Sequence, residues 1–226
     1  MLIGTKHMLR KHSSLNLRIK NNVIGQVQSF KYLGVFIDSE MKWSLHIEEL
    51  CKKIGKMISF LGRLSSFVNE SGLKLLYNSV IMPHIDYADV IWSSAAKTHL
   101  EMLQKLQNRA GRIILKVKPS EHKSIHEIHY VLNWETLQKR QTRHMYSLMY
   151  KIFHNLTPTY LEEKFKFKST GYALRTDNNL TLPKPNTQSC KRTFSYRGSV
   201  LYNELPLHIR ESSSTTIFNR EVQLFL

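Results

Sequence analysis

The stretch from Trp43 to Leu64, WSLHIEELCKKIGKMISFLGRL, decides the fold class. Its apolar residues recur at alternating steps of four and three positions: Trp43, Ile47, Leu50, Ile54, Met57, Leu61 and Leu64. That period places them on one face of an α-helix of about six turns. Ser39 or Ser44 is the expected N-cap. Three lysines lie off the apolar face: Lys52, Lys53 and Lys56.

Further helices are predicted downstream. The second runs from Asn69 or Ser71 to Met82 and ends before Pro83, because proline lacks the amide N–H of a helix interior. The third covers about 97–117, with an apolar stripe of Leu103, Leu106, Ala110, Ile113 and Val117. Residues 124–132, 134–155, 194–205 and 217–226 also favour helices. Residues 166–192 are rich in Lys, Ser, Thr, Asn and Pro, which predicts a loosely structured connector.

A row of cations follows the apolar stripe of the third helix at steps of four, three and four: Lys105, Arg109, Arg112 and Lys116. At 100° per residue this row lies about a third of a turn from the apolar one. One face can therefore pack on a core while its neighbour presents cations to a sugar-phosphate backbone. Glu101 is the only carboxylate between Ala95 and Ser120. A solvated helix face without a partner is the alternative.

Residues 15–37 favour β structure. Leu15, Leu17 and Ile19 alternate with polar residues, and Asn21-Asn22 can form a turn. The run 32–37 is apolar on both faces, which predicts a buried strand. The predicted fold class is mainly α with a small N-terminal β portion (α+β).

The composition indicates a polyanionic partner. Of the 226 residues, 33 are Lys or Arg and 17 are Asp or Glu, which gives a formal net charge of +16. Nucleic acid is the commonest partner of such a chain. An anionic membrane surface is the weaker alternative, and no apolar run approaches the roughly 18 to 20 residues that span a bilayer. The start of the chain lacks the long apolar core of a secretory signal, so secretion is not expected. The location is otherwise open, and is nuclear or cytoplasmic if the chain is expressed.

The chain offers no convincing catalytic, metal or cofactor set of its own. The segment Tyr87-Ala88-Asp89-Val90 resembles a magnesium-binding Tyr-x-Asp-Asp turn, but Val90 replaces the second aspartate. Asp86 and Asp89 are more simply explained as helix-surface or capping residues. Three histidines can share a helix face but lack a fourth ligand of diagnostic spacing: His122, His126 and His129. Cys51 and Cys190 are expected to be free thiols.

An ordered series of motifs resembles one family. It begins with Phe30-Lys-Tyr-Leu-Gly-Val-Phe-Ile-Asp38 and Met41-Lys-Trp43, and continues with Leu106-Gln-Asn-Arg-Ala110 and Tyr202-Asn-Glu-Leu-Pro206. These motifs resemble the end of the palm, the thumb and the C-terminal extension of reverse transcriptases from LINE-type (non-LTR), jockey-like retrotransposons.

The resemblance implies four segments. Residues 1–38 correspond to a palm remnant, 39–118 to a thumb-like helical domain, 119–165 to a helical C-terminal extension, and 166–226 to a connector with short terminal helices. In this family the thumb grips the template–primer duplex, while magnesium and the catalytic aspartates belong to the upstream palm. The resemblance therefore implies binding of an RNA–DNA or RNA duplex, without catalysis by this chain alone. The expected binding residues are Lys105, Arg109, Arg112, Lys116, Lys52, Lys53 and Lys56.

Two alternatives remain open. The chain can be one piece of a polymerase that works when the upstream palm is supplied, which an in-frame upstream Tyr-x-Asp-Asp would indicate. It can instead be a decayed or domesticated protein-interaction module that catalyses nothing. In that case the exposed edge of the N-terminal sheet is expected to promote self-association.

Overall fold

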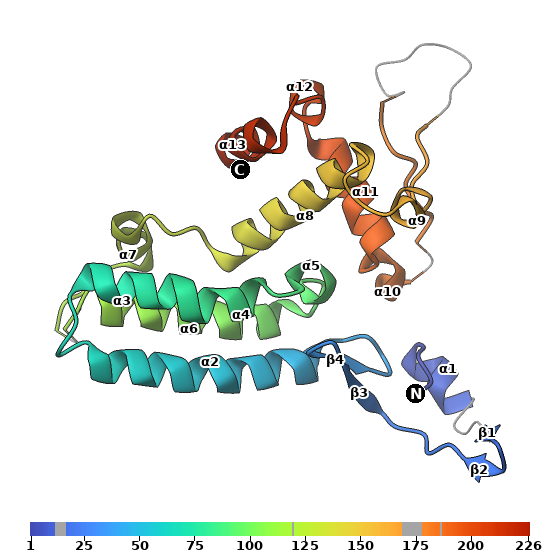
Figure 1. The fold of residues 1–226 in the computed structure, drawn as a ribbon, viewed down its shortest axis with the longest axis horizontal. Coiled ribbons are helices and arrows are strands. Elements are labelled where there is room, and N and C mark those ends of the chain that lie inside the picture. Colours follow the sequence, from blue (N-terminus) through green and yellow to red (C-terminus); the bar gives the residue numbers. More distant parts are fainter. Residues whose placement is uncertain (12–16, 119, 169–177, 186) are drawn as a thin grey trace. The chain divides into compact units, whose positions relative to one another are not determined.

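The computed structural model describes residues 1–11, 17–118, 120–168, 178–185 and 187–226. The fold is mainly α with two small antiparallel sheets near the N-terminus, as the sequence predicted (Figure 1). The chain forms two compact units. Unit 1 consists of Met1–Ala88 and Ser94–Trp134, and unit 2 of Asp89–Ser93 and Glu135–Leu226. The four-segment division implied by the family resemblance stays a prediction.

Two hairpins follow a short helix, α1 (Lys6–Lys11), that the sequence analysis missed. Strand β1 (Arg18–Ile19) pairs with β2 (Asn22–Val23), and β3 (Ser29–Tyr32) pairs with β4 (Val35–Asp38). Leu15 lies outside the described residues.

The predicted buried strand over 32–37 is wrong, because the chain turns within it. Leu33 and Gly34 both have positive φ, 44° and 83°, which is the geometry of a tight hairpin turn of type I′. Leu33 is 73% exposed, and only Val35 of this run is buried. The first hairpin turns in the same way at Lys20 and Asn21, one position before the predicted Asn21-Asn22 turn.

Helix α2 (Ser44–Leu64) forms where the period predicted it. Its predicted serine cap is wrong: the N-cap position is Trp43, whose side chain makes no capping bond. The Asp38 carboxylate instead accepts hydrogen bonds from the amides of Lys42 and Trp43, over 3.0 and 2.8 Å. Ile47, Leu50, Ile54, Ile58 and Leu61 are buried, so Ile58 takes the inner position expected for Met57.

The helix predicted to end at Met82 continues past Pro83. Helix α3 (Glu70–Leu76), with Asn69 as N-cap, leads into the π-helix η1 (Tyr77–Ile81) and then α4 (Met82–Asp86). The wider π turn lets the Met82 amide bond to the Tyr77 carbonyl. Pro83 then falls in the first turn of α4, where its missing N–H costs no helical hydrogen bond.

Helix α6 (Lys97–Ile114) ends three residues before the predicted end. Its buried residues are Leu103, Gln107, Ala110, Gly111 and Ile114, whereas Leu106 and Ile113 are only half-buried. Helix α7 (Ile125–Leu132) packs beside it and begins with a capping box between Ser124 and Glu127. These helices complete the core of unit 1.

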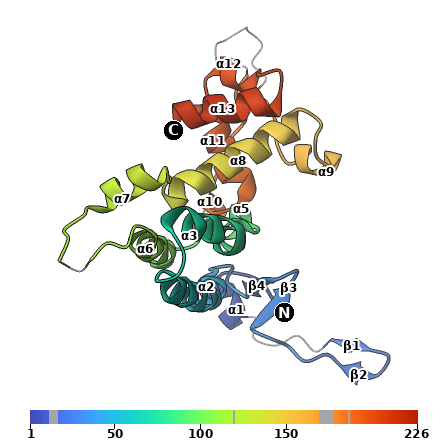
Figure 2. The same cartoon turned by 60° about the vertical axis from the view of Figure 1, so that its left-hand side comes forward.

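Unit 2 is built around α8 (Leu137–Phe153). Helices α11 (Phe194–Glu204) and α13 (Thr215–Phe225) pack against α8 (Figure 2). Shorter helices accompany them: α5 (Asp89–Trp92), α9 (Thr159–Glu162), α10 (Gln188–Lys191) and α12 (Leu207–Arg210). One buried cluster contains Tyr146, Tyr150, Leu205, Ile209, Phe218 and Val222.

The predicted loose connector is more ordered than expected in its described parts. Leu180 is fully buried and pairs with Phe167 in an antiparallel bridge, and Gln188–Lys191 forms α10. The side chain of Asn203 holds Leu180 at both ends, since it accepts from the Leu180 amide and donates to the Leu180 carbonyl. Residues 169–177 and 186 of the predicted connector lie outside the described residues.

Candidate nucleic-acid interface

The candidate interface lies on two parallel helices of unit 1, α2 and α6. Three contacts fix their alignment: Trp43 with Ser94, Glu48 with His99, and Gly62 with Ile113. In each pair the second residue comes fifty-one positions after the first. The two helices therefore run in the same direction and in constant register along their length.

The solvent faces of α2 and α6 point the same way. On α2, Gly62 faces α6, the preceding Leu61 is buried, and the following Arg63 is exposed. On α6 the order is reversed, because Ile114 is buried after Ile113 and Arg112 is exposed before it. Successive residues are about 100° apart on a helix. In two parallel helices, the residue after the contact position on one helix and the residue before it on the other lie on the same side of the pair. Arg63 and Arg112 therefore share one face.

The cations of α6 are available to a partner. Lys105, Arg109 and Arg112 are exposed. Within the described ranges, none of these three side chains has a carboxylate at ion-pair distance. The prediction that these cations point away from the core therefore agrees with their placement, while their role in binding stays a prediction.

The fourth predicted cation, Lys116, is exposed but does not lie on the helix. It has a φ of 51°, in the left-handed region. Its amide bonds to the Ile113 carbonyl, and the Val117 amide bonds back to the Arg112 carbonyl. This pair of bonds is a Schellman motif, which ends α6 and places Lys116 just past its last turn.

The three lysines predicted on α2 have different environments. Lys52 forms an exposed ion pair with Glu49 at 2.7 Å, and this hydrogen bond raises the pKa of Lys52. Lys53 lies 3.3 Å from Nδ1 of His84, whose pKa is lowered by burial and then by the Lys53 charge. Lys56 is exposed and, in the part of the chain that the structure describes, has no ion pair. Lys56 is therefore the most available of the three.

A further exposed cation of α2 was not among those predicted from the sequence. Arg63 is exposed, and its guanidinium carbon lies 5.6 Å from the centre of the Phe60 ring. The signal was present, because Arg63 follows Lys52 by eleven positions and Lys56 by seven, both close to whole numbers of helical turns. We use the name basic face for Lys52, Lys56, Arg63, Lys105, Arg109 and Arg112.

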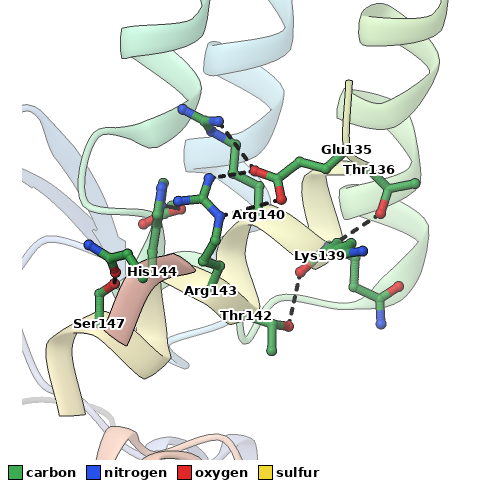
Figure 3. A network of polar contacts seen from close by, with 11 residues as sticks. Glu135, Thr136, Lys139, Arg140, Thr142, Arg143, His144 and Ser147 are labelled. Atoms are coloured by element: carbon green, nitrogen blue, oxygen red, sulfur yellow. Dashed lines mark hydrogen bonds and ion pairs between the residues drawn. The ribbon is translucent and has the colours of Figure 1, made fainter. Parts of the chain in front are cut away.

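Cations on α8, in unit 2, are placed differently. Arg140 and Arg143 both bind the carboxylate of Glu135, and all three side chains are partly buried (Figure 3). Thr136 caps the same helix by accepting a hydrogen bond from the Lys139 amide. These arginines have an acidic partner inside the fold, which Lys105, Arg109 and Arg112 of α6 lack among the described residues.

Several residues of the motifs considered for metal or nucleophilic chemistry make hydrogen bonds within the fold. Asp89 was expected at a helix surface or cap; it begins α5, but it is 3% exposed and bonds Nδ1 of His144 at 2.6 Å. The Tyr87 hydroxyl donates to the Leu33 carbonyl. His129 is buried against Asn108, and burial followed by the His126 charge lowers its pKa.

The thiols are free, as expected, and Cys51 is a poor nucleophile. Cys51 and Cys190 form no disulfide. Burial, reinforced by the Glu48 charge, raises the pKa of the Cys51 thiol to about 11. Its reactive thiolate is therefore scarce at neutral pH. In the described part of the chain, no helix has the length and apolar content needed to cross a membrane.

Comparison with known proteins finds polymerases of Drosophila mobile elements. The chain is 24% identical over 109 residues to the probable RNA-directed DNA polymerase from transposon X-element of Drosophila melanogaster, covering 47% of this chain and 12% of that protein. It is 27% identical over 99 residues to the RNA-directed DNA polymerase from mobile element jockey of Drosophila funebris, covering 42% and 11%. A third relative, the probable RNA-directed DNA polymerase from transposon BS of Drosophila melanogaster, is 24% identical over 131 residues, covering 57% and 14%.

These relatives confirm the resemblance to reverse transcriptases of jockey-like, non-LTR elements that the motifs predicted. The match spans only about an eighth of the length of each relative. No family model matches the chain, and no solved structure matches it. The chain thus resembles part of a retrotransposon RNA-directed DNA polymerase.

Proposed function

We propose that the basic face of α2 and α6 binds the template–primer duplex in a retrotransposon RNA-directed DNA polymerase. The observation that carries the proposal is the set of three α6 cations that are exposed and have no acidic partner among the described residues: Lys105, Arg109 and Arg112. In this proposal the chain binds and orients the duplex. Magnesium and bond formation are assigned to catalytic segments of the polymerase.

The spacing of the cations suits a sugar-phosphate backbone. With a rise of 1.5 Å per residue, Lys105, Arg109 and Arg112 follow one another at about 6 and 4.5 Å along the axis. A parallel second row on α2, which includes Lys56 and Arg63, widens the positive surface. Such contacts fix position and supply affinity but read no sequence. We therefore expect duplex binding that depends strongly on salt and weakly on sequence.

A binding titration tests the proposal. We expect the full chain to bind a fluorescein-labelled 16-base-pair RNA–DNA hybrid, with log affinity falling against log salt at a slope of roughly −3 to −4 if four phosphates are neutralised. The triple variant K105Q/R109Q/R112Q should bind roughly tenfold or more weakly at low salt and show a slope that is shallower by about 2 to 3.

A matched control separates this site from net charge alone. Lys164, Lys166 and Arg220 are exposed cations of unit 2. The variant K164Q/K166Q/R220Q lowers the net charge of +16 by the same three units. It should bind the hybrid within about twofold of the parent chain. Equal losses in the two triple variants, or no binding by the parent chain at low salt, would contradict the proposal.

A second candidate function is protein interaction through the β3–β4 hairpin. Phe30, Tyr32 and Leu33 expose 56%, 59% and 73% of their surface. An exposed strand edge with large apolar residues favours pairing with another chain. If this candidate holds, light scattering should show self-association that rises with concentration and is reduced in F30S/Y32S. A concentration-independent monomer would remove the self-association form of the candidate.

A further inference from the structure

A stripe of alternating cations and aromatic rings follows the solvent side of α2 and its C-terminal end: Lys56, Phe60, Arg63 and Phe67. The steps are four, three and four positions, so the four side chains lie along one line. Phe60 is 54% exposed and Phe67 is 87% exposed, and both cations are exposed. We call this set the cation–aromatic stripe.

The geometry at the end of α2 keeps the stripe continuous. Phe67 follows the helix, but its amide still bonds to the Leu64 carbonyl at 2.9 Å, as in a helical turn. The Arg63 guanidinium stands over the Phe60 ring, with 5.6 Å from its carbon to the ring centre. An isolated exposed apolar side chain is ordinary on a protein surface. It is unusual for exposed rings to alternate regularly with cations that have no acidic partner in the described residues.

A hollow of about 270 Å³ lies beside Phe60. Its lining includes Lys56, Phe60, Leu61, Leu76 and Val80. Lys56 is the only polar side chain in this lining. A ligand with a flat apolar part and a negative charge can therefore place the flat part next to Phe60 and the charge near Lys56. The hollow offers almost no hydrogen-bonding groups with which to distinguish one base from another.

We propose that the cation–aromatic stripe binds unpaired nucleotides of a single strand, with bases stacked on Phe60 and Phe67 and phosphates held by Lys56 and Arg63. Single-stranded nucleic acid repeats a planar base and a negative charge, which complements the alternation of rings and cations. An apolar protein helix could fill the hollow, but it would leave Lys56 and Arg63 without a negative partner. The inference deepens the proposed function, because Lys56 and Arg63 also belong to the basic face.

The test compares ring removal on single-stranded and duplex probes. In F60L/F67L the side chains stay apolar but lose their aromatic rings. We expect this variant of the full chain to bind a labelled twelve-nucleotide oligodeoxythymidine at least tenfold more weakly at 50 mM salt, since each stacked base contributes substantially to affinity. Its affinity for the blunt 16-base-pair RNA–DNA hybrid should stay within about twofold. Oligodeoxyadenosine should give the same pattern.

Three further variants sharpen the test. Y130L removes another exposed ring of unit 1, 82% exposed on α7, and should leave binding unchanged. F60W/F67W should retain binding, and its added indole fluorescence should be quenched by the oligonucleotide as the bases stack. F67L alone serves if F60L disturbs the hollow, because Phe67 does not line it.

Each failure has a distinct meaning. Parent-like binding of the single strand by F60L/F67L and F67L would overturn the stripe. An equal loss of affinity for the blunt duplex in F60L/F67L would also overturn it. So would a parent chain that does not bind the single strand, and that result would favour a protein partner for the exposed rings. K105Q/R109Q/R112Q tests duplex binding alone, so failure of the proposed function is measured separately.

Discussion

The indole Nε1 of Trp43 donates a hydrogen bond to the Ser94 hydroxyl over 3.1 Å, joining the residues that precede the parallel helices α2 and α6. This bond is the first of the three contacts along α2 and α6 whose partners are fifty-one positions apart in the sequence. It therefore helps to set the register that brings Arg63 and Arg112 to one face.

We expect Trp43→Phe to lower the free energy of unfolding by about 1 to 3 kcal/mol, through the lost hydrogen bond and the lost packing of a side chain that is 4% exposed. Urea titration followed by circular dichroism measures the change. Trp134→Phe is the matched control, because its buried Nε1 has no partner within the described structure. Trp134→Phe should lower the free energy of unfolding by less than Trp43→Phe does. The reverse order would show that the Trp43–Ser94 hydrogen bond does not account for the loss of stability.

Two glycines of unit 1 should respond in opposite ways to alanine. A Cβ on Gly111 would lie 2.7 Å from Cγ2 of Ile128, because α6 and α7 approach closely there. Gly111→Ala should destabilise the fold by about 1 to 3 kcal/mol. A Cβ on Gly55 of α2 would meet nothing within 4 Å. Gly55→Ala should stabilise by up to about 1 kcal/mol, because it improves helix propensity. Thermal melts of both variants give the sign directly.

The periodicity of the sequence predicted the helices because burial on one face is a local pattern. It could not predict that Pro83 would be accommodated, because that depends on the π turn starting at Tyr77. It also could not separate a buried strand from a hairpin in the run 32–37. Two successive residues with positive φ, Leu33 and Gly34, decided that question, and leucine is an unusual residue for such a turn.

The candidate site was predictable to a similar extent. The spacing of Lys105, Arg109 and Arg112 was enough to place them away from the core. Their acidic neighbours were not predictable, because ion pairs depend on rotamers and on residues brought in from other segments. Arg140 and Arg143 show this on α8, since they also lie off an apolar face and yet share Glu135.

Two substitutions at Lys116 separate the effect of its charge on binding from the effect of its backbone strain on stability. Its left-handed φ of 51° favours glycine, so Lys116→Gly should stabilise the fold by up to about 1 kcal/mol while removing a cation. Lys116→Ala removes the same charge and keeps the strain. If Lys116 contacts a phosphate, both variants should bind the RNA–DNA hybrid more weakly and reduce the salt slope by about 1. Unchanged slopes in both would remove Lys116 from the interface.

Acidification should weaken unit 1 between pH 7.5 and 5.5. Burial, then the Lys31 charge, lowers the pKa of His46 below its ordinary 6.5, and burial lowers the pKa of His129 and His84 in the same direction. The unfolded chain therefore takes up protons first as the pH falls through 6.5, and stability is lost from there down to the folded pKa. The urea midpoint should fall across this range.

His46→Gln identifies the contribution of one of these groups. Nδ1 of His46 accepts a hydrogen bond from the Phe36 amide at 3.4 Å, and the glutamine carbonyl can also accept one. The variant should show a flatter dependence of its urea midpoint on pH. A midpoint that rises on acidification, in either protein, would contradict the assignment of neutral buried histidines.

Arg210 should be the most sensitive polar position of unit 2. It is 8% exposed and donates to the carbonyls of Leu205, Asn178 and Asn203 over 2.7 to 2.9 Å. Its guanidinium also lies 4.8 Å from the centre of the Tyr202 ring, and burial lowers its pKa. Only a planar group with several donors reaches all three carbonyls, so lysine cannot replace it.

We therefore expect Arg210→Lys to destabilise the fold by about 2 to 4 kcal/mol, because buried carbonyls lose their partners. Arg220→Lys makes the same chemical change at an exposed position of α13 and should stay within about 0.5 kcal/mol of the parent chain. Hydrogen exchange measured by mass spectrometry should show faster exchange at Leu180, whose amide is bonded to Asn203. Equal stability of the two variants would mean that these bonds do not hold the C-terminal helices together.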